Sequence, residues 1–361
     1  MNKKICILTD SLSKGGAEKV AANLTISLTN KGYQVYVVSM TNVIDYQFTG
    51  NLYNFGLIKE AQNKFKAFLE FKNYFRKHKF DVIIDHRVRD KYLKEILFSK
   101  IIFRKQKVIY CIHSYNLSFY FSFLKLPRLA KFPHTKDHKF VAVCHEIKDY
   151  LNKTLNINSI HINNYLLNNT TPFENFNEDF FDEYIIGVGR LNKIKQFDKL
   201  ITCYKNSNLP INKIKLLILG DGENKKVLKQ LVEDLKLKDL VNFYPFRENP
   251  YGLIRNAKAL VLTSKTEGFP MVLLEALSLN TPVISFDCKS GPGEIIKHGI
   301  NGLLVDDQNE EALTLAINKL VDPHFYQKIK ANADLDLEQF SESKAIEKWK
   351  DIFENPNKYF S

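Results

Sequence analysis

Glu267 and Glu275, separated by seven residues, are the side chains of this sequence that point most clearly to chemistry. The apolar run at residues 259–263 predicts a buried strand, and residues 269–279 predict a helix. Glu267 is therefore expected in the loop between them and Glu275 on the helix. Amides at a helix N-terminus bind anions, and carboxylates accept hydrogen bonds from hydroxyl groups. The pair indicates a site for a polyhydroxylated ligand that also carries phosphate.

The sequence around the two glutamates resembles a known family. It reads EGFPMVLLEAL and is followed by TPVI and GPGE. This arrangement resembles the E(x7)E signature of the family 4 retaining nucleotide-sugar glycosyltransferases, which have the GT-B fold. Two glutamates at this spacing occur by chance in most chains, so the surrounding motif carries the resemblance. The alternative is a surface glutamate and a buried helical glutamate in an unrelated α/β protein.

Two cations, Arg190 and Lys195, follow a predicted strand at residues 185–188 in the segment IIGVGRLNKIKQFDKLI. Open α/β sheets bind ligands at the carboxyl edge of their strands. Two cations there could neutralise a diphosphate both in the ground state and as it leaves. In the family that the chain resembles, an Arg and a Lys in GRL(x3)K have this role. The alternative, two solvated basic side chains, fits Lys193 better than Arg190.

Two positions in the first half of the chain also match the family. Gly15 and Gly16 lie between a predicted strand and a predicted helix, where the absence of a Cβ allows another group to approach the backbone. The resemblance implies that this GGAE loop lies beside the donor phosphates and the acceptor, although a plain turn would look similar. His113 follows the strand VIYCI, and the family has a histidine there that contacts the donor sugar or the acceptor. A lone histidine is more often structural.

The second half contains a glycine turn that fits a dinucleotide fingerprint poorly. Gly220 and Gly222 follow a strand, but the third glycine of GxGxxG is absent. We interpret this GDG as a tight turn, which in the family borders the nucleotide pocket. The resemblance also implies that the nucleobase lies against the loop at residues 244–247, which includes Phe246.

Strands and helices that alternate along the whole chain are expected to position these residues. Apolar runs predict a first series of strands at residues 5–9, 35–39, 82–85, 108–111 and 141–144. A second series is predicted at residues 185–188, 216–219, 241–244, 260–263 and 283–286. Such alternation implies parallel sheets covered on both faces. The predicted fold is α/β of the GT-B type, with two Rossmann-like domains that face each other across a cleft.

The predicted domain boundaries follow from length and composition. A chain of 361 residues suggests two domains, and an asparagine-rich, acidic stretch separates the two series of strands. We predict an acceptor-side domain at residues 1–165, a linker at 166–184 and a nucleotide-sugar domain at 185–340. In the family the terminal helix, here within residues 341–361, crosses back to the first domain. Ala345, Trp349 and Phe353 predict one apolar face of that helix.

The charge is concentrated in the first part of the chain. Residues 1–160 contain 27 Lys and Arg against 12 Asp and Glu, whereas residues 161–361 contain 25 against 28. This surplus suits an anionic membrane or a phosphate-bearing acceptor, with a solvated lysine-rich surface or nucleic acid as alternatives. No stretch of about 20 apolar residues and no signal peptide is present, so a cytoplasmic protein is expected. Five scattered cysteines without a CxxC pair indicate buried reduced thiols.

Two stretches of the first domain combine aromatic and basic residues. Phe65, Phe68, Phe71 and Phe75 recur as on one helix face, for which core packing is slightly favoured. The aromatic run at residues 114–124, followed by bases, suits either burial or shallow insertion at an anionic interface.

Two short patterns could suggest a metal ion. His134 and His138 are four residues apart, but we interpret them as loop histidines because no third ligand accompanies them. The DLD at Asp334 to Asp336 superficially resembles a metal-binding DxD, but it is expected to face solvent in a late helical region. No metal and no cofactor are predicted to be required.

By resemblance, the protein transfers a hexose or N-acetylhexosamine from a nucleotide-diphosphate sugar with retention of configuration, and UDP is the expected nucleotide. The residues expected at the reacting centre are His113, Arg190, Lys195 and Glu267. The residues expected to bind the donor are Gly15, Gly16, Arg190, Lys195, Phe246, Glu267, Gly268, Phe269, Pro270, Met271, Val272 and Glu275.

The expected acceptor is a glycan or a lipid-linked glycan of cell-surface polysaccharide or lipopolysaccharide synthesis, held at the inner face of the cytoplasmic membrane. Three alternatives stay open. The chain could be a catalytically silent GT-B scaffold that binds a partner, a nucleotide-sugar epimerase, or a basic nucleic-acid binder. The last lacks recognition motifs.

Overall fold

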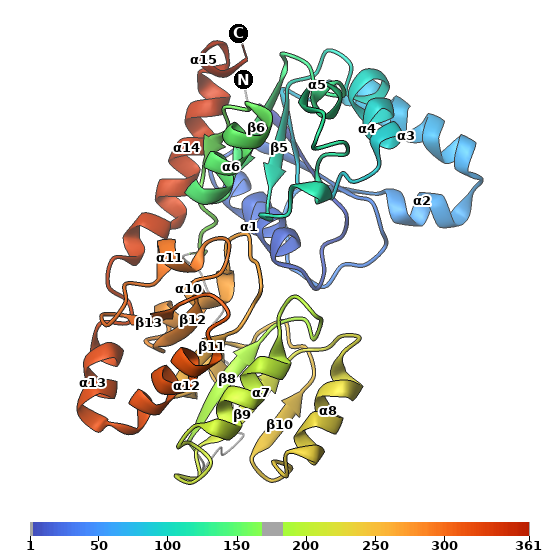
Figure 1. Ribbon diagram of the computed structural model, residues 1–361. Coiled ribbons are helices and arrows are strands. Elements are labelled where there is room, and N and C mark those ends of the chain that lie inside the picture. Colours follow the sequence, from blue (N-terminus) through green and yellow to red (C-terminus); the bar gives the residue numbers. More distant parts are fainter. Residues whose placement is uncertain (1–2, 168–182, 361) are drawn as a thin grey trace. The chain divides into compact units, whose positions relative to one another are not determined.

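The computed structural model describes residues 3–167 and 183–360. The chain forms two compact units, one of residues 1–167 with 340–361 and the other of residues 168–339. We call them unit 1 and unit 2. Each contains one parallel sheet with helices packed on it (Figure 1), so the predicted pair of Rossmann-like α/β domains is confirmed. The predicted linker at 166–184 lies mostly outside the described residues.

Unit 1 has a seven-stranded sheet in the order β3-β2-β1-β4-β5-β6-β7, with every pairing parallel. The strands are β1 (Lys4–Thr9), β2 (Gln34–Ser39), β3 (Asn51–Asn54), β4 (Val82–Asp85), β5 (Val108–Ile112), β6 (His138–Ala142) and β7 (Ile160–His161). The strand order changes direction between β1 and β4. Ligands bind outside the carboxyl ends of strands at such a switch point, so the loops after β1, β4 and β5 are the ones of interest.

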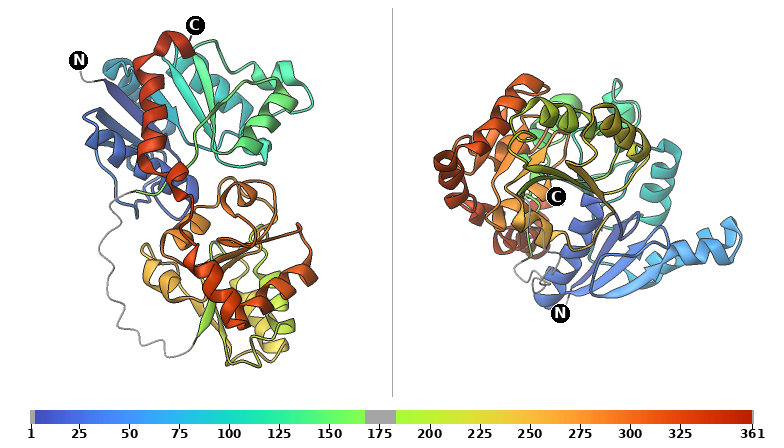
Figure 2. Two further views of the ribbon diagram at one scale, coloured as in Figure 1. Left: turned by 90° about the vertical axis from the view of Figure 1, so that its left-hand side faces the viewer. Right: turned by 90° about the horizontal axis from the view of Figure 1, so that it is seen from below.

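The helices of unit 1 come from both ends of the chain. They are α1 (Gly16–Asn30), α2 (Phe55–Ala61), α3 (Lys64–His78), α4 (Tyr92–Leu97), α5 (Pro127–Lys131), α6 (His145–Leu155), α14 (Glu342–Glu354) and α15 (Pro356–Tyr359), with a π-helical turn at Phe98–Ile102 and a 3-10 turn at Leu117–Phe119. The long C-terminal helix α14, red in Figures 1 and 2, packs on this core. Ala345, Trp349 and Phe353 are 6%, 4% and 1% exposed, which confirms the predicted apolar face.

Unit 2 has a six-stranded parallel sheet in the order β10-β9-β8-β11-β12-β13. Its strands are β8 (Tyr184–Val188), β9 (Lys215–Leu219), β10 (Val241–Tyr244), β11 (Ala259–Leu262), β12 (Val283–Phe286) and β13 (Gly302–Val305). Its helices are α7 (Phe197–Asn206), α8 (Lys225–Asp234), α9 (Tyr251–Asn256), α10 (Met271–Ser278), α11 (Pro292–Ile295), α12 (Glu310–Asn318) and α13 (Pro323–Ala331), with 3-10 turns at Lys319–Val321 and Leu337–Phe340. Here the strand order changes direction between β8 and β11, so the loops after these two strands flank the switch point.

Several details differ from the sequence predictions. The short strands β3, β7 and β13 are not among the predicted strands, and α10 begins at Met271 rather than at residue 269. The predicted helix face of α3 is only partly right, because Phe71 and Phe75 are buried whereas Phe65 is 72% exposed. Phe65 lies in the first turn of the helix, before the surface that packs on the sheet.

The five cysteines are buried free thiols, as predicted. Within residues 3–167 and 183–360, no helix has both the length and the apolar content needed to cross a bilayer.

Candidate functional site

Lys195 and Glu267 form an ion pair at the switch point of unit 2. The distance from Lys195 Nζ to Glu267 Oε1 is 2.6 Å, and the two side chains are 24% and 11% exposed. They come from the loops after β8 and β11. Backbone contacts hold these loops together, since the Thr263 hydroxyl donates to the Lys195 carbonyl at 3.0 Å and the Lys265 amide donates to the Ile194 carbonyl at 2.8 Å. The pair is thus fixed in place and still open to a ligand.

The N-terminus of α10 lies directly after Glu267. Pro270 is its N-cap residue and, in the part of the chain that the structure describes, no side-chain cap is formed there, so the N-cap residue offers the amides of the first turn no acceptor. The preceding loop is held from the other side by Ser290, whose hydroxyl donates to the Gly268 carbonyl at 3.0 Å. An uncapped helix start beside a carboxylate can bind an anion with the amides and hydroxyl groups with the acid.

Gly291 explains why the GPGE segment follows EGFP in this sequence. Its φ of +99° is in the left-handed region, and a Cβ at this position would lie 2.6 Å from Pro270 Cδ and 3.1 Å from Phe269 Cα. Only glycine permits this approach. The loop after β12 therefore packs directly against the start of α10, although the residues in contact are far apart in sequence.

Glu275 lies on α10 and is 6% exposed, and the Glu267 side chain is 11% exposed, so both carboxylates are largely covered. Phe269 and Met271 are also buried, at 5% and 7%, whereas Val272 is partly exposed. The side chains of the EGFPMV segment therefore serve mainly to anchor the turn. Backbone amides and the two glutamates are what this segment can offer to a ligand.

Arg190 is exposed at the end of β8, and the GDG turn lies against its loop. A Cβ on Gly220 would lie 1.9 Å from the Gly189 carbonyl oxygen, and one on Gly222 would lie 2.4 Å from the Leu191 carbonyl oxygen. These glycines therefore admit neighbouring backbone, in agreement with the tight-turn interpretation. The Gly220 amide also donates to the Tyr244 carbonyl at 3.0 Å.

That last contact places the loop after β10 next to the GDG turn. Within this loop Phe246 is 37% exposed. The loops after β8, β9 and β10 are thus linked by backbone contacts, and Arg190, the GDG turn and Phe246 belong to one continuous edge of unit 2.

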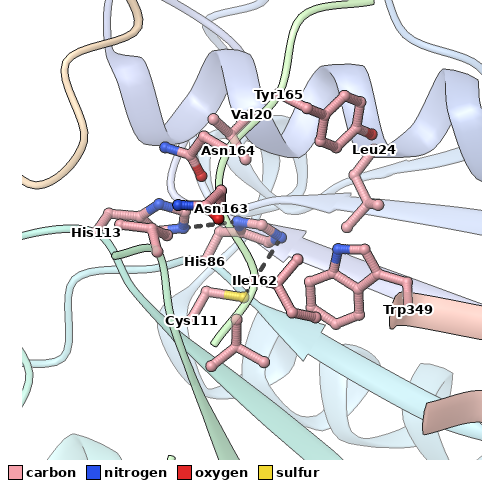
Figure 3. A pocket seen from close by; sticks show the side chains of 12 residues that line it. Val20, Leu24, His86, Cys111, His113, Ile162, Asn163, Asn164, Tyr165 and Trp349 are labelled. Carbon is pink, nitrogen blue, oxygen red and sulfur yellow. Dashed lines mark hydrogen bonds between the residues drawn. The ribbon is translucent and has the colours of Figure 1, made fainter. Parts of the chain in front are cut away.

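His113 follows β5 in unit 1 and is paired with a second histidine. His86 Nδ1 and His113 Nε2 are 2.9 Å apart, and the Cys111 sulfur lies 3.9 Å from His86 Nε2. Figure 3 shows these side chains along one wall of a pocket whose lining also includes Tyr165 and Trp349. His86 is not among the residues predicted from the sequence. His86 comes right after β4 as His113 comes after β5, but their pairing depends on β4 and β5 being neighbours in the sheet, which the strand pattern of the sequence does not give.

Burial determines the protonation of this cluster. It lowers the pKa of His86 to about 3 and the pKa of His113 well below its ordinary value, and it raises the pKa of the Cys111 thiol. Both imidazoles are therefore neutral at pH 7, each with one donor and one acceptor nitrogen. If the thiol donates to His86 Nε2, His86 Nδ1–H donates to His113 Nε2. His113 Nδ1 then carries a proton and is buried without a hydrogen-bond partner among the described residues.

A buried charge network holds the loop that contains His86. Arg87 donates to both carboxylate oxygens of Asp85, at 3.0 and 2.7 Å, and both side chains are fully buried. Arg89 donates to the carbonyls of Arg87 and Cys111, at 2.9 and 3.2 Å. Burial lowers the pKa of Arg87, but the Asp85 and Glu95 carboxylates outweigh it and raise that pKa above its ordinary value. The network ties the ends of β4 and β5 together.

Gly15 and Gly16 form the start of α1, as the sequence predicts. A Cβ on Gly15 would lie 1.8 Å from a Glu18 carboxylate oxygen, whereas one on Gly16 would meet nothing within 4 Å. Gly15 thus makes room for a side chain of its own helix. Gly16 leaves open space.

Three residues considered for a metal ion have structural roles. The interpretation of His134 and His138 as loop histidines is wrong for His138, the first residue of β6. Both rings pack edge-on against Tyr110, with centroid distances of 4.9 and 5.3 Å. Asp336 is exposed and forms an ion pair with Lys297.

Similarity to known proteins identifies the class of protein to which this fold and site belong. Residues 171–335 match the family described as Glycosyl transferases group 1, and residues 14–163 match Glycosyltransferase Family 4. Anabaena HepE in complex with UDP and glucose superposes with a TM-score of 0.76 at 18% identity, covering 98% of this chain and all (100%) of that one. The lipopolysaccharide outer core galactosyltransferase WaaB gives a TM-score of 0.65 at 20% identity, with 98% and 99% coverage. The fold is therefore that of the GT-B glycosyltransferases.

The sequence relationship is more specific. The amylovoran biosynthesis glycosyltransferase AmsD of Erwinia amylovora is 30% identical over 359 residues, which cover 97% of this chain and 99% of that protein. The chain belongs to glycosyltransferase family 4, and it is a transferase enzyme. The resemblance drawn from EGFP, the two glutamates and GPGE is thus confirmed.

Proposed function

We propose that the protein transfers a hexose or N-acetylhexosamine from a UDP-sugar to a glycan or lipid-linked glycan in cell-surface polysaccharide synthesis, with retention of anomeric configuration. The observation that carries this proposal is the Lys195–Glu267 pair beside the uncapped start of α10. The names of similar proteins support it, since AmsD is named for amylovoran biosynthesis and HepE holds UDP and glucose.

The ion pair suits a ligand in which a phosphate adjoins a sugar. An ammonium group has three donors, and a carboxylate has about four acceptor positions. The contact at 2.6 Å uses one of each. Lys195 therefore keeps donors for phosphate oxygens while Glu267 keeps acceptors for hydroxyl groups. A sugar diphosphate presents both kinds of group a few bonds apart.

The roles of the remaining residues are proposed from the family resemblance. Arg190 and Lys195 bind the diphosphate and stabilise its charge as it leaves. Glu267 and the amides of Phe269 to Val272 hold the donor sugar. Glu275 accepts from the ribose hydroxyls, and the loop that contains Phe246 holds the base.

His113 donates from Nδ1 to an oxygen of the donor sugar or the acceptor, because that N–H has no hydrogen-bond partner among residues 3–167 and 183–360. Gly16 and the GGAE loop leave space for the donor phosphates and the acceptor. We propose that no metal ion or cofactor takes part, since two cations already serve the diphosphate.

Retention is proposed to occur on one face of the sugar. Glu267 is engaged by Lys195, which makes it a poor nucleophile. The acceptor oxygen bonds to the anomeric carbon as the bond from that carbon to the phosphate oxygen breaks. The acceptor proton passes to the leaving phosphate.

Transfer would be tested by incubating the protein with a panel of UDP-sugars and lipid-linked glycans from bacterial membranes, with measurement of UDP release and NMR of the product. The proposal expects acceptor-dependent UDP release and a product with the anomeric configuration of the donor. Inverted product would refute retention. A changed sugar still attached to UDP, without acceptor, would support the epimerase alternative, and no turnover with any donor would support a silent scaffold.

We also propose that the acceptor is reached at the cytoplasmic face of the membrane, by a peripheral protein. The support is the charge distribution, because the basic surplus lies wholly within residues 1–160. Cytoplasmic leaflets carry anionic lipids, which attract basic surfaces.

A further inference from the structure

An unusual concentration of exposed apolar side chains lies on unit 1, between β5 and β6. Phe119, Phe123, Leu126, Leu129 and Phe132 are 37%, 51%, 58%, 38% and 57% exposed. We call these five residues, with the bases among them, the aromatic–basic face. Single exposed apolar residues are ordinary, but a contiguous group of large ones marks an interaction site.

The frame beneath this face is well packed, so the exposure is not due to a loose loop. Leu117, Tyr120 and Phe121 alternate with the exposed residues and are 1%, 5% and 3% exposed. The Tyr120 hydroxyl accepts from the His113 amide at 2.9 Å. The segment that packs beside His113 through its buried residues therefore exposes its other side chains to solvent.

Helix α4 extends the face. The Tyr92 and Phe123 rings meet edge-on with centroids 5.0 Å apart, and the Tyr92 hydroxyl donates to the Leu129 carbonyl at 3.2 Å. Leu93, next to Tyr92, is 79% exposed. Figure 1 shows α4 and α5 as neighbours on this side of unit 1.

The charge around the face is almost entirely positive. Residues 88–132 contain ten Lys and Arg but only two acids, and one base, Arg89, and one acid, Glu95, are buried. Lys125 and Arg128 are exposed within the apolar group, and the Lys131 side chain is partly exposed behind them. The Lys100 ammonium lies 5.3 Å from the Phe132 ring centroid.

We propose that the aromatic–basic face docks on an anionic lipid bilayer, with Phe123, Leu126 and Phe132 inserted at the level of the headgroups. Bases beside aromatic and leucine side chains are the composition that binds such an interface. A second copy of this chain is a poor occupant, because two such faces would bring like charges together. This inference rests on the proposed function, in which a lipid-anchored acceptor is used by the site that contains His113.

Vesicle sedimentation would test the face. The wild type should bind phosphatidylglycerol vesicles at low salt, bind them less at high salt, and bind pure phosphatidylcholine weakly. Each base near an anionic surface contributes a factor of about five, so Lys125→Ala/Arg128→Ala/Lys131→Ala should weaken binding on the order of a hundredfold. Removing the same charge from exposed bases of unit 2, as Lys226→Ala/Lys229→Ala/Lys238→Ala, should leave binding within about a factor of three.

A second matched pair of variants tests the apolar residues of the aromatic–basic face. Leu126→Ser/Phe132→Ser should weaken binding about tenfold or more. Ile211→Ser/Val227→Ser, which changes even more exposed apolar residues of unit 2, should not. Leu126→Trp should show a blue shift of emission on vesicles, against the signal of the single native tryptophan, buried Trp349. Equal losses in the two charge variants, or no shift for Leu126→Trp, would overturn the proposal.

Two readouts keep the inference separate from the function on which it rests. UDP should raise the melting temperature of the wild type and of every variant above, because none changes the donor site. A wild type that transfers sugar but ignores anionic vesicles would refute the face alone. A wild type that binds vesicles through this face but has no affinity for any nucleotide would refute the function alone.

Discussion

Replacing Gly291 by alanine should damage the donor site although no residue assigned to donor binding is itself replaced. Its φ is +99°, and the new Cβ would lie 2.6 Å from the Pro270 ring and 3.1 Å from Phe269 Cα. The left-handed backbone alone costs about 1–2 kcal/mol for alanine, and overpacking adds about 1–3 kcal/mol. The ring and the backbone it meets cannot rotate away. The start of α10 must therefore move.

Gly299→Ala is the matched control. Gly299 also has a positive φ, +74°, and lies in unit 2, but a Cβ there would meet nothing within 4 Å. Both variants bear the backbone strain, and only Gly291→Ala bears the clash. Their difference therefore isolates the contact between the GPGE and EGFP segments.

The assay is UDP-sugar binding by calorimetry, alongside thermal melting. If the shift of α10 removes one hydrogen bond to a charged group, about 1.5–3 kcal/mol is lost, and the Kd rises roughly tenfold to a hundredfold. Gly299→Ala should melt at a lower temperature than wild type but bind UDP-sugar with unchanged Kd. Equal affinities for the two variants would refute the reasoning that Gly291 supports the anion-binding start of α10.

Three further perturbations concern unit 1. The pKa of His86 is about 3 in the fold and about 6.5 in the unfolded chain. Unfolding therefore takes up a proton, and stability should fall as pH decreases from about 6.5 towards 3. The melting temperature of His86→Gln should depend less on pH, and a pH profile identical to that of the wild type would contradict the neutral state of His86. Arg87→Ala removes the bidentate partner of the buried Asp85 and leaves it only the longer ion contact with Arg89 at 3.9 Å. This should cost about 3–5 kcal/mol in thermal or urea unfolding, and a cost below about 1 kcal/mol would mean that the pair is not the anchor of its loop. Phe71→Ala should destabilise the fold by about 3–5 kcal/mol, whereas Phe65→Ala should change its stability by less than about 0.5 kcal/mol. A lower melting temperature for Phe65→Ala than for Phe71→Ala would contradict the burial of Phe71 and the exposure of Phe65.

The architecture could be predicted because most of its strands have a clear apolar signal. Most of the predicted runs are largely apolar, and residues 108–111 and 216–219 are continuously so, as expected for strands buried on both faces. The missed strands at the edges of the first sheet lack that signal. β3 reads NLYN, and β7 has only two residues. Their pairing is decided by neighbouring strands rather than by their own composition.

The positions of Arg190, Lys195 and Glu267 at the carboxyl edge of the sheet could be predicted because each residue follows a strand. Arg190 and Lys195 come after β8, and Glu267 comes after β11, and these strands are neighbours at the switch point. Contacts that depend on long-range packing could not be predicted. The sequence shows neither the approach of Gly291 to Pro270 nor the exposure of Phe65.

His86 is the most instructive omission. Its type and its place after β4 match those of His113 after β5, so strand adjacency would have paired them. Apolar runs predict where the strands lie along the chain, but they do not give the order of those strands in the sheet. Without that order, two histidines 27 residues apart give no sign that their rings meet.

The central claim is that Lys195 and Glu267 form the binding site for a nucleotide sugar, and a thermal-shift screen of UDP, GDP, ADP and UDP-sugars tests it most directly. Ligand that binds only the folded state raises the melting temperature. We predict a shift with UDP and UDP-sugars for the wild type and for Lys193→Ala, an exposed lysine of the same loop. The shift should disappear in Lys195→Ala and in Glu275→Ala. No shift with any nucleotide, or equal shifts in Lys193→Ala and Lys195→Ala, would contradict the claim.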